Sequence, residues 1–223
     1  MGEYIDLTAA DGHKLSAYLS RPIGKAKGRL VVFQEIFGVN QHIRNVCDRF
    51  AADGYTALAP AMFDRVERNV ELKYTAETME QGRDLRARIS WDDMMIDARA
   101  AINYLSVEGS VGIIGYCWGG SIVWLAACRI EGVCCASSYY GAQISMFNDE
   151  NPACPIVLHF GENDPFIPLN DVDMIRAAHP TVDVHVYEGA DHGFECEERQ
   201  SFDETARNLA RQRSLALFAA HIK

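Results

Sequence analysis

Short hydrophobic runs alternate along this chain with stretches whose hydrophobic residues recur at helical spacing. The first run covers residues 30–33, and the stretch at 43–53 follows it with one apolar helical face made of Ile43, Val46, Cys47 and Phe50. Further strands are predicted at 55–59, 111–114, 132–139, 156–160 and 182–187, and further helices at 91–105 and 201–222. This alternation predicts an α/β fold with a mainly parallel central sheet and helices on both faces.

The first twenty residues follow a different pattern. Two strand-like runs, 4–7 and 14–18, flank an Asp11-Gly12 pair that is typical of a tight turn, so we predict an N-terminal antiparallel hairpin at the edge of the sheet. Residues 62–90 are the most charged and least strand-like part of the chain, which makes them the candidate lid over the ligand end. No linker divides the sequence, and we expect residues 1–223 to form a single domain.

Composition and charge exclude several classes of function. Lys and Arg number 21 against 31 Asp and Glu, and the resulting formal charge of −10 repels phosphate backbones and anionic membrane surfaces. We therefore expect neither a nucleic-acid partner nor a membrane partner. The N-terminus lacks the apolar run of a signal peptide, and seven irregularly spaced cysteines do not form a disulfide pattern, so a cytoplasmic protein is predicted. The sequence does not indicate an oligomeric state, and it is compatible with a monomer.

Residues 111–128 form an uncharged stretch of nearly membrane-spanning length, but glycines interrupt it. We predict instead a central strand at 111–114, a sharp turn at 115–119 and a helix from Ser121 onward. The turn, Gly-Tyr-Cys-Trp-Gly, fits the pattern Gly-x-nucleophile-x-Gly, in which glycines relieve crowding between strand and helix. The N-terminus of a helix also favours a thiolate. Cys117 is therefore a candidate nucleophile, although a buried structural cysteine would fit the bare motif too.

Two further residues follow predicted strands at the same edge of the sheet. Asp164 comes after the strand at 156–160, and His192 after the strand at 182–187. The order nucleophile, acid, histidine is that of α/β-hydrolases. We prefer Asp164 over Asp191 as the partner of His192, because an adjacent aspartate points the wrong way in most turns. Each residue alone also fits a turn or a surface loop, but the three together favour a catalytic site.

These motifs resemble the dienelactone hydrolase family of the α/β-hydrolase superfamily. The similarity rests on the loop Gln-Glu-Ile-Phe-Gly-Val-Asn at 34–40, the cysteine-containing turn and the loops at 161–168 and 190–194. It implies the α/β-hydrolase fold and a carboxylic ester hydrolase similar to carboxymethylenebutenolidase. In that role Cys117 would be the nucleophile, His192 the general base and acid, and Asp164 the residue that orients His192.

The resemblance implies further roles in the loop at 34–40. The Glu35 carboxylate would interact with the thiol in the resting enzyme and move when substrate arrives; a solvated or helix-capping glutamate is the structural alternative. The backbone N–H groups of Ile36 and Trp118 would hold the oxyanion. Attack on a lactone would form a thioester acyl-enzyme and release an enolate. No cofactor is implied, and no metal site is indicated, because the remaining histidines lack ligand spacing.

The substrate site departs from the family pattern. Family members acting on dienelactone hold the substrate carboxylate with arginines, one of them four residues after the catalytic histidine, where this chain has Cys196 among acidic residues. A second arginine should come from the candidate lid, which offers Arg83, Arg86 and Arg88. The candidate substrate-binding residues are therefore Arg83, Arg86, Phe37, Tyr140 and Cys196.

Three functions stay open at this point. The favoured one is hydrolysis of a small lactone or activated ester, nominally dienelactone (4-carboxymethylenebut-2-en-4-olide), to maleylacetate. The second is a related carboxylesterase for a neutral or bulkier ester, motivated by Glu195 and Glu197 on either side of Cys196. The third is a noncatalytic or redox-sensing member of the fold, motivated by the seven cysteines and the missing arginine, and the fold alone does not decide between them.

Overall fold

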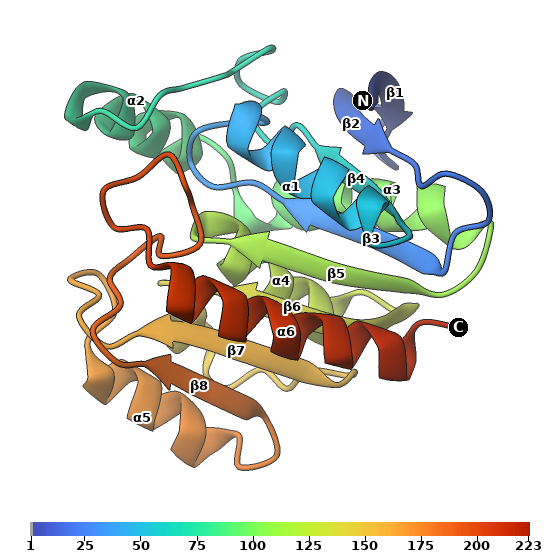
Figure 1. Cartoon of the computed structure of the whole chain (residues 1–223). Helices are drawn as coiled ribbons and strands as arrows, with labels where there is room; N and C mark the ends of the chain where they lie inside the picture. Colours follow the sequence, from blue (N-terminus) through green and yellow to red (C-terminus); the bar gives the residue numbers. More distant parts are fainter. Residues whose placement is uncertain (1) are drawn as a thin grey trace.

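The central sheet is mainly parallel and carries an antiparallel hairpin at one edge (Figure 1). This computed structural model describes residues 2–223 and shows the strand order β1-β2-β4-β3-β5-β6-β7-β8. The strands are β1 (Glu3–Thr8), β2 (Lys14–Ser20), β3 (Gly28–Phe33), β4 (Tyr55–Pro60), β5 (Val111–Tyr116), β6 (Val133–Tyr139), β7 (Ile156–Gly161) and β8 (Asp183–Tyr187). Strand β2 pairs antiparallel with β1 and β4, and the other neighbours are parallel. The predicted fold class is confirmed.

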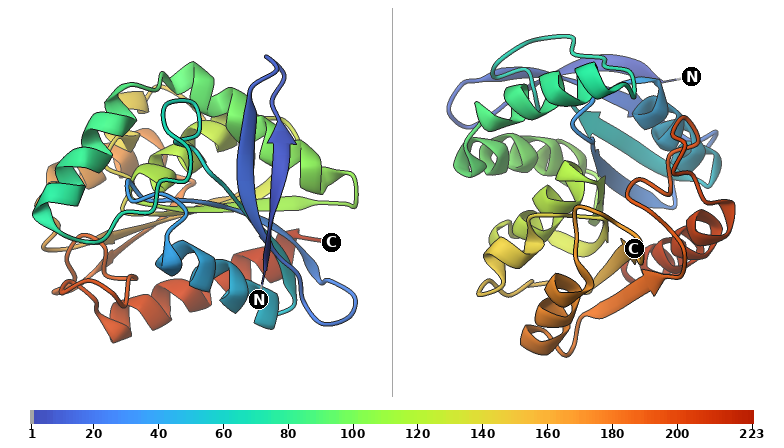
Figure 2. Two further views of the ribbon diagram at one scale, coloured as in Figure 1. Left: turned by 90° about the horizontal axis from the view of Figure 1, so that it is seen from above. Right: turned by 90° about the vertical axis from the view of Figure 1, so that its left-hand side faces the viewer.

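Helices cover both faces of the sheet (Figure 2). They are α1 (Gln41–Ala52), α2 (Ala76–Ala87), α3 (Trp91–Ser106), α4 (Trp118–Arg129), α5 (Leu169–Ala178) and α6 (Glu204–His221), with a short 3-10 helix η1 (Ile144–Phe147). Helices α1 and α6 lie on one face, and α3, α4 and α5 lie on the other. The apolar face predicted for residues 43–53 is buried as expected. None of the helices in the described part of the chain is long and apolar enough to cross a membrane.

The uncharged stretch at 111–128 lies in the middle of the molecule. Every residue of β5 is buried, and so are ten consecutive residues of α4. A Cβ on Gly119 would lie 2.3 Å from the Phe33 carbonyl oxygen, and one on Gly115 would lie 2.2 Å from the Gly119 carbonyl oxygen. Because only glycine permits this close contact, the packing outweighs the low helix propensity of glycine. Helix α4 consequently begins at Trp118 rather than at the predicted Ser121.

The carboxyl ends of the parallel strands point to the left in Figure 1, where α2 and the loop before α6 also lie. Helix α2 falls within the candidate lid at 62–90, for which the sequence predicted no helix. Only Gly82 and Leu85 of α2 are buried, so its apolar periodicity is weak. A capping box starts the helix instead: the Thr75 side chain accepts from the Thr78 N–H, and the Thr78 side chain accepts from the Thr75 N–H. Helix α5 was likewise not predicted.

Candidate active site

Cys117 lies at a strained turn between β5 and α4. Its backbone angles are φ 54° and ψ −117°, a region that residues other than glycine rarely adopt. The residues on both sides of Cys117, Tyr116 and Trp118, are buried, whereas Cys117 itself is only partly buried. The turn therefore presents one sulfur at the N-terminus of a helix, where free N–H groups favour negative charge.

His192 and Asp164 form a short hydrogen bond beside this sulfur. The His192 Nδ1 atom lies 2.7 Å from Asp164 Oδ2, and the other carboxylate oxygen accepts from the Phe166 N–H at 2.8 Å. Both side chains are buried. Asp191 is turned away from the ring and accepts instead from the backbone N–H of His192 at 2.6 Å. The ring thus pairs with Asp164, the partner that the sequence favoured.

The surroundings of His192 make its imidazole a stronger base than usual. Burial alone would lower its pKa, but the neighbouring Cys117 sulfur and the hydrogen bond to Asp164 raise the pKa to about 10. The rings of Tyr140 and Phe166 pack against the imidazole, with centroids 5.0 and 5.1 Å away. The ring is therefore held in place and is able to keep a proton taken from the thiol.

A cavity of about 180 Å³ opens over Cys117 and His192. The predicted oxyanion residues, Ile36 and Trp118, line the same cavity. Trp118 is the first residue of α4, so its N–H has no partner within the helix. The nucleophile candidate, the base candidate and two candidate N–H donors consequently meet at one place.

Some of the predicted substrate-binding residues line this cavity and others do not. Phe37, Arg83 and Arg86 line it, the two arginines projecting from α2. The Arg83 guanidinium lies over the Phe166 ring, 5.5 Å from its centroid. Tyr140 and Cys196 are fully buried and are absent from the lining. The Tyr140 ring packs against His192, while Cys196 lies near Glu35 in a separate buried cluster.

Sequence reasoning missed Arg199, which reaches the cavity from the loop after His192. Its Nη1 atom lies 3.4 Å from Glu35 Oε1. Gly193 makes room for it, since a Cβ there would lie 2.5 Å from that nitrogen and the backbone φ is +80°. The resemblance predicted an arginine at position 196. The sequence signal that could have identified the cation is Arg199, three residues later in the same loop. A cation is therefore present where the sequence suggested an acidic surface.

Glu35 is completely buried in the loop after β3. Its Oε2 atom accepts from the Tyr74 hydroxyl at 2.9 Å, and its Oε1 atom faces Arg199. Burial, followed by the charge of Glu35, raises the pKa of Tyr74, so the phenol stays protonated and donates. Within residues 2–223 no hydrogen bond joins Glu35 to Cys117, and the resting contact implied by the resemblance stays a prediction.

The acidic side chains around Cys196 face away from the cavity. Glu195 is buried and pairs with Arg49 at 2.9 Å, while the exposed Glu197 pairs with Arg49 at 3.3 Å and with Arg207 at 2.9 Å. Neither glutamate lines the cavity. The two glutamates that motivated a neutral-ester site therefore lie outside the cavity.

The strand order, the strained turn and the cavity at the carboxyl ends define a hydrolase of the α/β-hydrolase fold. Residues 15–222 match the model of the dienelactone hydrolase family. The chain therefore belongs to the dienelactone hydrolase family.

Individual relatives cover nearly the whole chain. A Synechocystis sp. protein provisionally named a carboxymethylenebutenolidase is 36% identical over 94% of this chain and 93% of its own length. The carboxymethylenebutenolidase of Pseudomonas putida is 30% identical over 97% of this chain and 96% of its own. A crystal structure from Klebsiella pneumoniae, provisionally named a dienelactone hydrolase, has a TM-score of 0.83 and 28% identity, and the match covers 98% of this chain and all of that one. These similarities agree with the predicted family and fold.

Proposed function

We propose that this protein is a cysteine-dependent hydrolase of small lactones or activated esters that carry a carboxylate, with dienelactone, opened to maleylacetate, as the expected substrate. One observation carries the proposal: Cys117 and His192, which is hydrogen-bonded to Asp164, line a cavity that arginines also line. Arg83, Arg86 and Arg199 supply the positive charge that a carboxylate needs in a protein whose formal charge is −10.

The proposed reaction begins with transfer of the Cys117 proton to His192. The thiolate attacks the lactone carbonyl, a C–S bond forms, and the N–H groups of Ile36 and Trp118 stabilise the oxyanion. The ring C–O bond then breaks and the enolate leaving group takes the proton from His192, which yields a thioester and a neutral imidazole. Water attacks this thioester with His192 as the base, and the C–S bond breaks to restore the thiolate. Asp164 keeps the imidazole oriented through both steps.

Glu35 has an additional role in this proposal. A substrate carboxylate that binds Arg199 removes the cation that now faces Glu35, and the freed glutamate then helps to deprotonate Cys117. Binding of substrate would therefore promote formation of the thiolate. Such timing protects the enzyme, since a permanent exposed thiolate is prone to oxidation.

The chemistry and the size of the cavity favour small activated substrates. A thiolate leaves a tetrahedral intermediate more easily than an alkoxide does, so a good leaving group such as an enolate is required for the thioester to form. The cavity volume, about 180 Å³, is below the ~300–1,000 Å³ of pockets for drug-sized ligands. Both points support a small lactone over an amide or a bulky ester.

Replacement of Cys117 tests the proposal. We expect Cys117→Ala to lower turnover of dienelactone and of para-nitrophenyl acetate by at least about a thousandfold, because the covalent route is removed. The matched control is Cys128→Ala, which removes a partly buried cysteine from the far end of the same helix α4 and should leave turnover unchanged. Unchanged turnover in Cys117→Ala would favour the noncatalytic or redox-sensing alternative.

A further inference from the structure

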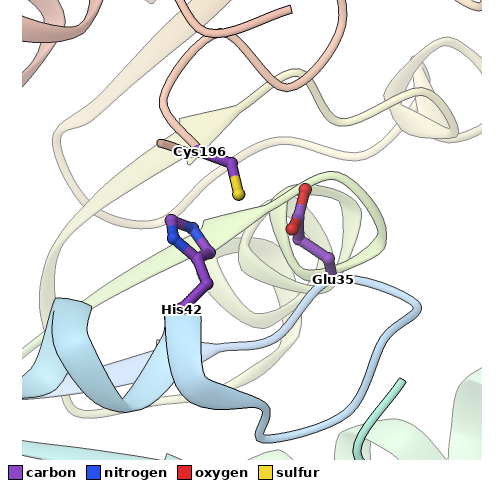
Figure 3. Close-up of side chains that lie close together, drawn as sticks. All are labelled: Glu35, His42 and Cys196. Atoms are coloured by element: carbon purple, nitrogen blue, oxygen red, sulfur yellow. The ribbon is translucent and has the colours of Figure 1, made fainter. Parts of the chain in front are cut away.

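A second group of ionisable side chains lies buried around Glu35 (Figure 3). The sulfur of Cys196, an imidazole nitrogen of His42 and a carboxylate oxygen of Glu35 all lie within 4.8 Å of one another. His42 is in the first turn of α1, Glu35 is in the loop after β3, and Cys196 is in the loop after His192. Figure 3 shows the three side chains converging, and each of them is buried.

Glu195 completes the surroundings of His42. Its Oε2 atom lies 3.2 Å from His42 Nε2, close enough for an ion pair although the geometry is not that of a hydrogen bond, while its Oε1 atom pairs with Arg49. Adjacent residues of one loop thus bring a carboxylate and a thiol to the same imidazole. The rings of Tyr74 and Tyr116 lie 6.4 and 6.3 Å from that imidazole, between centroids. The described groups that face His42 are therefore acidic or phenolic.

These neighbours keep His42 protonated. Burial by itself lowers the pKa of His42, but contact with Cys196 and then with Glu195 outweighs it and raises the pKa well above its usual value. Although Cys, His and Glu are donors typical of a metal site, a protonated imidazole is not a ligand. Glu35 and Glu195 already face Arg199 and Arg49, so each of the two carboxylates has a cation beside it without a metal.

Glu35 needs a second counter-ion if Arg199 is to serve the substrate. Arg199 faces Glu35 and also lines the cavity. When Arg199 turns to a substrate carboxylate, the remaining hydrogen-bond donor to Glu35 is the neutral Tyr74 hydroxyl. An ionised carboxylate buried without a cation is strongly unfavourable. Arg199 would then stay on Glu35 unless another positive charge lay nearby.

We propose that His42, held by Glu195 and Cys196, is the second counter-ion of Glu35 and thereby allows Arg199 to pass from Glu35 to the substrate carboxylate. This inference rests on the proposed function and deepens it. It assigns binding of the substrate carboxylate to Arg199, and it makes the affinity of the enzyme for the substrate depend on a cluster outside the cavity. His42 acts as a positioning residue, since it reaches the substrate only through Glu35 and Arg199.

The variant His42→Gln tests this role, because glutamine keeps an N–H donor and removes the charge. Hydrolysis of para-nitrophenyl acetate reports general damage to the site, and inhibition of that hydrolysis by maleate reports binding of a carboxylate to the arginines of the cavity, Arg199 among them. We expect the inhibition constant for maleate to rise about tenfold relative to the KM of the neutral ester, the size of a moderate coupling between sites. The KM for dienelactone should rise in parallel, with a much smaller change in kcat.

Two further variants separate charge from packing. His179 is another buried histidine, bonded to the Asn148 carbonyl oxygen, and His179→Gln should leave maleate inhibition unchanged. In a Glu35→Gln background no carboxylate needs a counter-ion, so adding His42→Gln should not change the affinity for maleate measured by calorimetry. The double-mutant cycle thus isolates the Glu35–His42 interaction.

Several outcomes would overturn the inference. One is an unchanged maleate inhibition constant in a His42→Gln protein whose thermal melt shows that it is folded. Another is stoichiometric metal in the purified wild-type enzyme that His42→Gln loses, which would make the cluster a metal site. Absence of any maleate inhibition in the wild type would overturn both this inference and the carboxylate specificity of the proposed function, whereas persistent turnover in Cys117→Ala would overturn the catalytic proposal alone.

Discussion

At the scale of single residues, environment distinguishes Cys117 from the other cysteines. All seven, which lie within the described residues, are free thiols. Burial, assisted by nearby charges, raises the pKa of Cys128 and of Cys154 to about 12. The pKa of the fully buried Cys47 is raised further. These thiols stay protonated near neutral pH. Among the cysteines, Cys117 combines the start of a helix, a strained turn and an adjacent histidine, which are conditions for a reactive thiol.

The unusual pKa of His192 provides a prediction at this scale. Burial lowers this pKa, but Cys117, the next largest influence, and Asp164 together raise it to about 10. We therefore expect the His192 ring to titrate at a clearly lower pH in Cys117→Ala, as followed by NMR of the imidazole protons. Asp164→Asn should also lower the pKa, because the ring loses its charged partner. An unchanged titration in both variants would contradict the assigned surroundings of His192.

The same shift links stability to pH. A histidine whose folded-state pKa lies above its unfolded value stabilises the fold at low pH, and that contribution is lost as the pH rises. For His192 the contribution is complete below about 6.5 and disappears as the pH approaches about 10. The free energy of unfolding should fall across this window more steeply in the wild type than in Cys117→Ala.

At the scale of elements, α2 is the part of the cavity wall with the weakest hold on the core. It contributes Arg83 and Arg86 to the cavity but buries little apolar surface of its own. Its start depends on the capping box between Thr75 and Thr78. We therefore expect this cap to contribute to the position of the two arginines.

Removal of this cap should weaken substrate binding more than chemistry. We expect Thr75→Ala to cost α2 about 1 kcal/mol of local stability and to raise the KM for dienelactone several-fold while kcat changes little. Hydrogen exchange of the α2 amides would show the fraying directly. Ser106→Ala is the control: the exposed Ser106 hydroxyl donates to the Asn103 carbonyl oxygen at the other end of α3, no residue of α3 lines the cavity, and KM should not change.

At the scale of the whole molecule, one buried ion pair joins segments that are distant in the sequence. Arg65, just before the segment that leads to α2, makes two hydrogen bonds of 2.7 Å to Asp97 of α3 and another of 2.8 Å to Asp11 in the turn between β1 and β2. Asp97 is almost fully buried. The pair therefore fixes the edge hairpin and the α2 segment to the layer of helices that contains α3.

Breaking this pair should destabilise the protein as a whole. We expect Arg65→Ala to lower the free energy of unfolding by about 3–5 kcal/mol, because it leaves the Asp97 charge buried and unpaired. Arg21→Ala, which removes an exposed pair with Glu3, should cost less than about 1 kcal/mol. Chemical denaturation measures both. A similar loss in the two variants would show that the buried position of Asp97 has no special effect.

The sequence alone determined the sheet, the turn at Cys117 and the order of Cys117, Asp164 and His192. These features follow from local patterns: apolar runs form strands, glycines allow the turn, and parallel strands bring their carboxyl ends to one edge. The edge hairpin and the family were also predicted from short sequence motifs. Helix α2 was missed because its apolar face is narrow, and α4 began earlier than predicted because tertiary packing overrode the propensity of its glycines.

Only the tertiary structure decided which way the loop side chains point. Cys196 and Tyr140 are buried outside the cavity, Arg199 lines it, and Glu195 faces His42. Irregular loops have no periodicity that assigns alternate residues to opposite faces, unlike strands and helices. The charge of His42 likewise depends on partners brought together from distant parts of the chain. The candidate site around Cys117 was therefore predictable from the sequence, whereas the charges around its cavity depended on how the loops pack.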